Sequence, residues 1–149
     1  MTPRPTIGIG GTPAHDAERA VELLVEDLQA GWDHHDADTT DRRLGDDVMW
    51  GSPFGATLRG YDRLHRIHEE LKQKSVGGDA SRFELVQWLT PAPGVAVAHV
   101  RRAALDERGA PLPSSDDTNG AFSEMALYVL VERDGEWWVA AGQNTLISR

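Results

Sequence analysis

Two histidines three positions apart, His65 and His68, have the residue type and spacing in this chain that best fit catalysis. Imidazole changes its charge near neutral pH, so it can take up or release a proton during a reaction. His68 shares a helical stripe with Leu64, Ile67 and Leu71, which turns its ring toward the interior. We therefore predict His68 to be the acid/base residue of an active site. The alternative is a buried histidine that is satisfied by a backbone carbonyl, and the sequence leaves both open.

A carboxyl group inside the same apolar pocket would complete an acid/base pair. Burial there would tune the pKa of either group toward neutral pH. Asp47 stands three residues before Trp50, at the start of the segment that leads to the histidines. We predict Asp47 to be the second catalytic residue, and the competing interpretation is that it caps a helix.

The spacing of His65 and His68 also raises the question of a bound metal. Protein zinc sites use three or more ligands, often including cysteine. This chain has no cysteine and shows no evident third ligand, so we predict neither a metal nor another cofactor. His65 is assigned to ligand binding instead. The neighbouring pair His34 and His35 follows a predicted helix end, where the helix dipole favours a solvated positive group.

Aromatic, amide and arginine side chains supply the remaining candidate binding residues. Five tryptophans in 149 residues fit a flat, unsaturated ligand, although aromatic stripes more often fill a core. Arg101 can hold a carboxylate, phenolate or enolate if its strand face lines a pocket, or pair with an acid if that face lies in a dimer. Gln143 and Asn144 lie on opposite strand faces, so only one can point inward. The predicted binding residues are Trp32, Trp50, Phe54, Tyr61, His65, Arg101, Tyr128, Gln143 and Asn144.

A corner between residues 46 and 67 must position most of these side chains. It contains an extended run with Trp50, a turn rich in glycine and proline, a second extended run, and a helix that continues to about Lys74. Glycine and proline at the turn fold the backbone over. Such a strand–turn–strand–helix unit can wall a ligand pocket. The alternative is a packed corner whose histidines only fill space.

Hydrophobic periodicity predicts the elements on either side of this corner. A helix begins at Pro13 and continues to about Trp32, and a brief second helix follows around residues 37–44. Period-two patterns then predict strands over 82–90, 95–105, 121–133 and 136–147. This order predicts an α+β domain over residues 13–149, with helices on one face of a curved antiparallel sheet, and a flexible tail over residues 1–12.

The strand over residues 121–133 is apolar on both faces, and the predicted helices can cover only one face of the sheet. The simplest cover for the second face is the same face of another copy, so we predict a twofold homodimer. We expect that dimer to bury the face that carries Tyr128. The alternative is a sheet that faces solvent with a few exposed aromatic side chains.

Charge and composition exclude several kinds of partner. The net charge of −9 repels phosphate backbones and anionic membrane surfaces, so we expect no nucleic-acid or membrane partner. No apolar run approaches the ~20 residues that a membrane span requires. The N-terminal segment also lacks the apolar core of a signal peptide. We therefore expect a cytoplasmic protein.

In its element order and short motifs, the chain resembles the nuclear-transport-factor-two-like superfamily, and within it SnoaL-like proteins of the SgcJ/EcaC type. The likeness covers roughly residues 14–147. It rests on the element order, on the ending Gly135-Glu136-Trp137 followed by the sequence of residues 140–145, and on the string D-V-x-W-x-x-P-x-G, which begins at Asp47. The resemblance implies a cone-shaped α+β barrel with a pocket between sheet and helices, often in a dimer. It also implies an association with bacterial secondary metabolism of the enediyne polyketide type.

The fold hosts several activities, so function must come from the site. We expect a cone-fold protein that binds a hydrophobic, aromatic or polyketide-derived small molecule and catalyses cyclisation or isomerisation by acid/base chemistry. The alternatives are a non-catalytic ligand carrier and an oligomerisation module. A buried histidine–carboxylate pair that borders a cavity favours the enzyme. An apolar cavity without that pair favours the carrier, and a cone filled by its own tryptophans favours the oligomerisation module.

Overall fold

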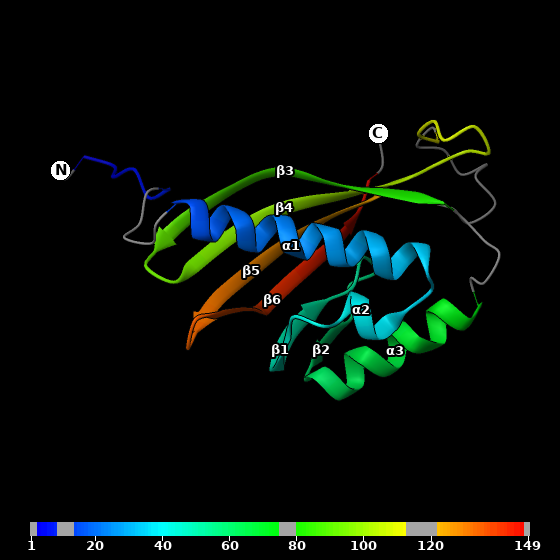
Figure 1. Cartoon of the computed structure of the whole chain (residues 1–149), viewed down its shortest axis with the longest axis horizontal. Coiled ribbons are helices and arrows are strands. Elements are labelled where there is room, and N and C mark those ends of the chain that lie inside the picture. Colours follow the sequence, from blue (N-terminus) through cyan, green and yellow to red (C-terminus); the bar gives the residue numbers. More distant parts are fainter. Residues whose placement is uncertain (1–2, 9–13, 75–79, 113–121, 148–149) are drawn as a thin grey trace.

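The computed structural model describes residues 3–8, 14–74, 80–112 and 122–147. Helices occupy the first half of this part of the chain and long strands the second half (Figure 1). No helix within these ranges is long and apolar enough to cross a membrane. The elements are α1 (Ala14–Asp33), α2 (Ala37–Thr40), β1 (Leu44–Gly51), β2 (Thr57–Arg59), α3 (Tyr61–Lys74), β3 (Ser81–Ala92), β4 (Val95–Ala104), β5 (Glu124–Arg133) and β6 (Glu136–Leu146).

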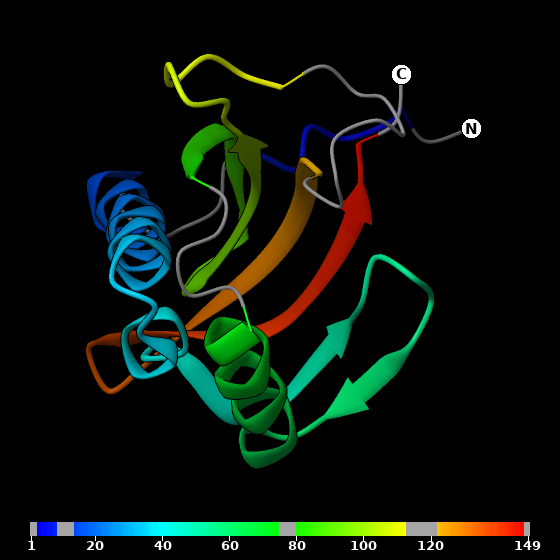
Figure 2. The ribbon, with the colours of Figure 1, turned by 90° about the vertical axis from the view of Figure 1, so that its right-hand side faces the viewer.

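The strands form one sheet in the order β2-β1-β6-β5-β4-β3. Neighbouring strands are antiparallel except β1 and β6, which pair in parallel. The sheet curves around the helices, which lie on its concave side (Figure 2). This arrangement confirms the predicted α+β fold with helices on one face of a curved sheet. The predicted tail over residues 1–12 lies partly outside the described residues; within it, the carbonyl of Gly8 accepts a hydrogen bond from the backbone of Thr90.

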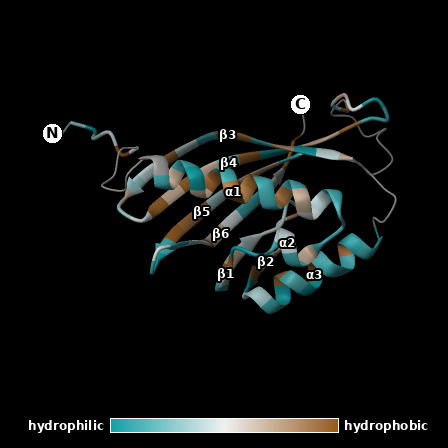
Figure 3. Cartoon of the chain, viewed as in Figure 1, coloured by the Kyte–Doolittle hydropathy of each residue, from teal (hydrophilic) through white to brown (hydrophobic). Residues whose placement is uncertain are grey.

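Helix α1 lies against β3 and β4 because its apolar residues recur on one face. The buried residues on this face are Ala17, Ala20, Val21, Leu24 and Leu28. Helix α3 packs against β1, β2 and α2 instead. It is largely hydrophilic (Figure 3). Only Leu64 is buried there, whereas Ile67 and Leu71 are exposed, so the predicted apolar stripe of α3 is covered at one position only.

Along strand β4, the two faces of the sheet differ in how deeply their side chains are buried. Ala96, Ala98 and Val100 are buried on the inner face, whereas Val97 and His99 on the outer face are only half-buried. The inner residues belong to the same core as the apolar side of α1. Alternation along the strand therefore separates a covered inner face from a partly exposed outer face.

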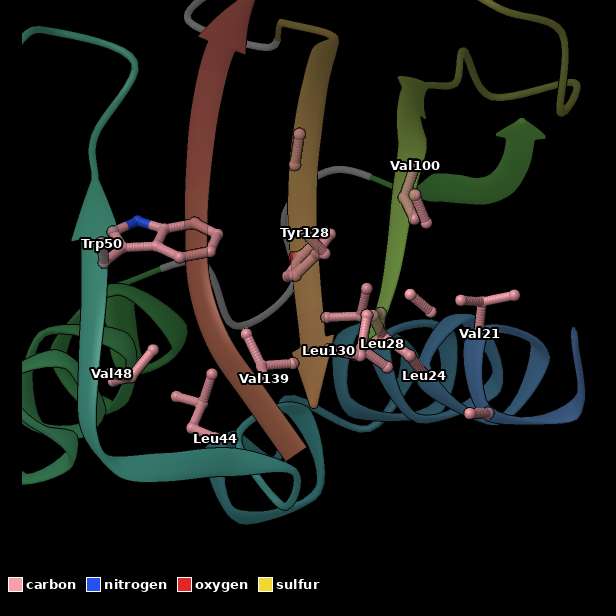
Figure 4. Close-up of a cluster of buried hydrophobic side chains, with 14 of the residues drawn as sticks. Val21, Leu24, Leu28, Leu44, Val48, Trp50, Val100, Tyr128, Leu130 and Val139 are labelled. Carbon is pink, nitrogen blue, oxygen red and sulfur yellow. The ribbon is translucent and has the colours of Figure 1, made fainter. Parts of the chain in front are cut away.

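The inner face of β5 carries Tyr128, which pairs in register with Ala98 of β4 and Gly142 of β6. Tyr128 is only 7% exposed and packs against Trp50. Figure 4 shows Tyr128 and Leu130 in one cluster with side chains of α1 and β1. The expectation that a second copy buries the Tyr128 face is therefore wrong, because the core of the same chain already covers that face.

Gly142 of β6 allows Trp50 to lie directly on the sheet. A Cβ atom at Gly142 would stand 2.7 Å from Cε3 of Trp50 and 3.2 Å from the carbonyl oxygen of Leu127. We expect Gly142→Ala to lower the free energy of unfolding by about 1–3 kcal/mol, as overpacking does. Urea unfolding measures this loss. Gly8→Ala is the control, since its Cβ would meet Leu89 at an ordinary 3.6 Å, and equal stability of both variants would contradict the packing.

Candidate functional site

The buried carboxylate of Asp41 is the centre of the candidate site. It follows α2 and is 1% exposed. The Nδ1 of His65 lies 2.8 Å from one oxygen, and the Nδ1 of His68 lies 2.6 Å from the other. An ionised carboxylate can only accept hydrogen bonds, so both imidazoles carry a proton on Nδ1. One acid thus fixes the orientation of two rings.

Local structure brings these groups together from two elements. The side chain of Asp36 accepts hydrogen bonds from the backbone N–H groups of Asp38 and Thr39, which caps the single turn of α2. That turn directs Asp41 into the interior. On α3, positions three apart lie on one side of the helix. His65 and His68 therefore reach the same carboxylate.

His65 is surrounded by negative charge. Its Nε2 lies 2.9 Å from Asp38 and 3.8 Å from Glu69, and its ring stacks on Tyr61 at a centroid distance of 5.0 Å. Burial acts to lower the pKa of His65, but the hydrogen bond to Asp41 and the nearby carboxylates outweigh it and raise the pKa above 6.5. These contacts therefore favour the imidazolium form of His65, which links α3 to α2 through Asp38 and Asp41.

His68 faces a different environment. Its side chain is 23% exposed, and its ring meets Trp50 edge-on at 6.5 Å, with Tyr128 on the same indole at 5.6 Å. Among the described residues, no hydrogen-bond partner occupies Nε2. In its neutral form His68 thus keeps its proton on the Asp41 side and presents a lone pair at Nε2. This is the geometry of a general base oriented by a carboxylate.

The hydroxyl of Tyr128 belongs to the same interior. The described part of the chain gives it no hydrogen-bond partner, although the residue is deeply buried. No fully enclosed side-chain oxygen or nitrogen of the described residues lacks a partner, so this hydroxyl borders accessible space. Burial raises the pKa of Tyr128, and the charges of Glu124 and Asp41 add to that effect. Tyr128 therefore keeps its proton and can donate a hydrogen bond.

Asp47 is not part of this site. Strand β1 turns Val48 and Trp50 inward, so Asp47 points to solvent with 86% of its side chain exposed and lies 3.7 Å from Arg59. The predicted pair of His68 with Asp47 is therefore corrected to His68 with Asp41. Neither does Asp47 cap a helix, because it lies within a strand.

Other predicted binding residues lie away from His68. Arg101 is on the outer face of β4, 3.8 Å from Glu84 of β3. Gln143 is also on the outer face, and its amide donates to the carbonyl of Ser52. Phe54 is 74% exposed at the turn after β1. The interpretations that placed Arg101 or Gln143 inside the cone are therefore wrong, since strand alternation turns both outward.

Three further residues stay near the interior. Asn144 is on the inner face of β6, opposite Ala126. Tyr61 lies beside His65, as described above. Trp32, near the end of α1, meets the ring of Phe83 at 6.1 Å and the guanidinium of Arg102 at 4.4 Å.

The sequence alone did not identify two important residues of this interior, Asp41 and Arg102. Asp41 lies in a polar stretch with several other acids, and nothing local distinguishes it from them. Arg102 did carry a signal, because alternation places this charged residue on the same strand face as Ala98 and Val100. A lone charge on an apolar strand face marks either an edge or an interior ion pair.

Two hollows on the described part of the chain both lie outside the space between α3 and the late strands. One of about 760 Å³ lies between α1 and the turns before β4 and β6, with Trp137 and Trp138 in its lining. The other, of about 230 Å³, is lined by residues of α2 and α3, including Asp38 and Lys72. Neither borders His68. The pocket expected inside the cone therefore stays a prediction.

A scan against protein-family models finds no match for this chain. A search of curated proteins likewise finds none.

Solved structures do match over most of the chain. A domain of unknown function with a cystatin-like fold from Nostoc punctiforme is 17% identical, with a TM-score of 0.75, and the match covers 93% of this chain and 81% of that one. A nuclear-transport-factor-two-like protein of unknown function from Shewanella oneidensis is 13% identical, with a TM-score of 0.66 and coverage of 86% and 98%. A ketosteroid isomerase-like protein from Erwinia carotovora is 14% identical, with a TM-score of 0.61 and coverage of 88% and 96%. At these identities the likeness concerns the fold, and the chain has the cone-shaped α+β fold of nuclear-transport-factor-two-like and cystatin-like proteins.

Proposed function

We propose that this chain binds a hydrophobic, aromatic or polyketide-derived small molecule between α3 and the curved sheet, and that it catalyses cyclisation or isomerisation by proton transfer. The observation that carries the proposal is the hydrogen bond from Nδ1 of His68 to the buried Asp41. This bond leaves Nε2 without a partner among the described residues, in a ring that meets Trp50, whose indole also contacts Tyr128.

The proposed reaction uses His68 as base and Tyr128 as donor. Nε2 removes a proton from a carbon next to a carbonyl, and Asp41 stabilises the imidazolium that forms. The hydroxyl of Tyr128 donates a hydrogen bond to the developing enolate oxygen. Return of the proton to another carbon completes an isomerisation. Attack of the enolate on a second carbonyl within the ligand closes a ring.

The arrangement of the helices supports a ligand at this place. Helix α1 packs on β3 and β4, and α3 packs on β1 and β2, so the inner faces of β5 and β6 lie between the two helices. The inner residues there include the small Ala126, and Gly142 under the indole of Trp50. Aromatic rings and a few polar groups around such a floor are typical of small-molecule sites.

The resemblances support the chemical class of this proposal. One structural neighbour is called ketosteroid isomerase-like, a name that describes that protein. The likeness of the sequence to SnoaL-like proteins of the SgcJ/EcaC type favours an aromatic polyketide ligand and a role in bacterial secondary metabolism. The alternatives are a ligand carrier without turnover and an oligomerisation module of the same fold.

We also propose that the outer face of the sheet pairs with a second copy. Apolar side chains from three strands remain partly exposed there, among them Leu89, Leu127 and Trp138. Burying such a face against its own copy is the usual solution for a twofold dimer.

A generic base-sensitive aromatic probe tests the catalytic proposal. 5-Nitrobenzisoxazole opens to a coloured phenolate when a base removes its ring proton. We expect the purified chain to accelerate this opening, and His68→Gln to lower the rate at least about tenfold, as loss of a general base does. Asp41→Asn should lower it as well. His99→Gln on the outer face is the control, and unchanged turnover in His68→Gln would rule out His68 as the base.

His65 makes the stability depend on pH in a defined direction. Its pKa is raised in the folded chain, so its contribution is complete below the ordinary value of 6.5 and disappears as the pH rises through the folded-state pKa. Urea unfolding at several pH values should therefore show a loss of stability on the alkaline side of 6.5. His65→Gln should remove this part of the loss. An identical pH profile in both proteins would contradict the assignment.

A charge on the outer face tests the dimer. Leu127→Arg places a cation among apolar side chains that another copy would bury, which costs several kcal/mol when unpaired. We expect wild-type chain to scatter light as a dimer and Leu127→Arg as a monomer. Arg63→Gln on α3 serves as the control. Monomeric wild-type protein at micromolar concentration would refute the pairing.

A further inference from the structure

Arg102 is a buried cation on the inner face of β4, next to the half-buried Arg101 on the outer face. Its side chain is 8% exposed, and a guanidinium so far from water needs compensating partners. Nε donates to the carboxylate of Glu124 at 3.0 Å, and Nη1 donates to the hydroxyl of Ser81 at 2.9 Å. These two bonds fix the orientation of the guanidinium.

The two bonds do not use all of the donors of Arg102. A guanidinium has five N–H groups, and among the described residues no acceptor faces Nη2. Because every fully enclosed side-chain nitrogen in that part of the chain has a partner, Nη2 borders accessible space. A donor pair on a deeply buried, immobilised arginine therefore remains available to a ligand.

Aromatic rings flank this arginine. Its Cζ lies 4.4 Å from the centroid of Trp32 and 5.3 Å from that of Phe122. Both rings attract the guanidinium through cation–π interactions and restrict its contact with water. They also offer flat apolar walls directly beside the available N–H groups.

A second cation also lies beside Trp32. The Nζ of Lys72 lies 5.4 Å from the same ring, so two cations share one indole. Glu124 is the ion-pair partner of Arg102. Burial lowers the pKa of Lys72, whereas the charges of Asp41 and Asp36 act in the opposite direction. An anion bound beside Arg102 would be attracted by both cations.

The strand register gives the distance from Arg102 to the proposed reaction centre. Glu124, the partner of Arg102, and Tyr128 both point inward from β5. They are four positions apart along the strand, which corresponds to about 14 Å at ~3.4 Å per residue. Since Tyr128 and His68 share the indole of Trp50, a ligand that reaches both ends must be elongated.

We propose that Arg102 binds a carboxylate, or a comparable anionic group, at one end of an elongated and largely apolar ligand whose reacting atoms lie beside His68. This inference rests on the proposed function, because it names the ligand class for the same interior. Arg102 acts as a binding and positioning residue and takes no part in the proton transfer.

Calorimetric titration with two rod-shaped probes tests the inference. 4-Biphenylcarboxylate carries the anion, and 4-biphenylmethanol is its uncharged counterpart. We expect the wild-type chain to bind the acid about tenfold more tightly than the alcohol, the effect of one charge-assisted hydrogen-bonded pair. Because Arg102→Gln alone leaves Glu124 unpaired, the test uses the double variant Arg102→Gln/Glu124→Gln, whose fold is checked by circular dichroism. Arg101→Gln is the matched control on the opposite face.

The preference for the acid should disappear in the double variant and persist in Arg101→Gln. A preference that survives in the double variant would overturn the inference, as would equal affinities of acid and alcohol for the wild-type chain. Equal affinities together with shifted NMR signals of the His68 ring would leave the proposed function standing. Failure of both probes to bind would count against the proposed function as well as this inference.

Discussion

The structure depends on one buried carboxylate. Asp41 is removed from water, a transfer that costs several kcal/mol for an uncompensated ion. Its two oxygens are satisfied by His65 and His68 from α3. Helix α3 buries only one of its own apolar side chains, Leu64, so this polar contact supplies much of what holds the helix in place. The contact of Asp41 with the two histidines therefore both holds α3 in place and orients the candidate base.

The same carboxylate serves two rings in different ways, because their surroundings differ. His65 also meets Asp38 and Glu69, and this concentration of negative charge favours its imidazolium form. His68 meets Asp41 on one side and the indole of Trp50 on the other. The charged form of His65 is thus favoured, whereas Nε2 of His68 has no hydrogen-bond partner among the described residues.

Much of the fold was predictable because its signals are local. The apolar stripe of α1, the alternation in β4 and the Asp134–Gly135 turn each follow from a short window of sequence. The choice of sheet face was not local: both faces of β5 are apolar, and only packing against α1 shows that Tyr128 points inward. That ambiguity produced the incorrect expectation about the dimer face.

The candidate site was likewise predictable only where its signals are local in the sequence. His68 was predictable from helical periodicity, whereas its acid partner lies 27 positions away in the chain and belongs to a turn without apolar anchors. Asp47 was chosen because it is close in sequence, yet the alternation that buries Val48 and Trp50 necessarily exposes it. Arg102 could have been identified as the charged member of an apolar strand face. Its partners Glu124 and Ser81 come from other strands and required the three-dimensional structure.

The most direct test of the account is the protonation state of the two rings, read from the ¹⁵N chemical shifts of the histidine side chains at neutral pH. Nitrogen shifts distinguish a protonated from an unprotonated ring nitrogen. We expect the neutral form of His68 to carry its proton on Nδ1 and to leave Nε2 free, as the contact with Asp41 requires. A His68 ring with its proton on Nε2 would contradict it, because Asp41 would then hold no hydrogen bond from that ring and no base would face the interior.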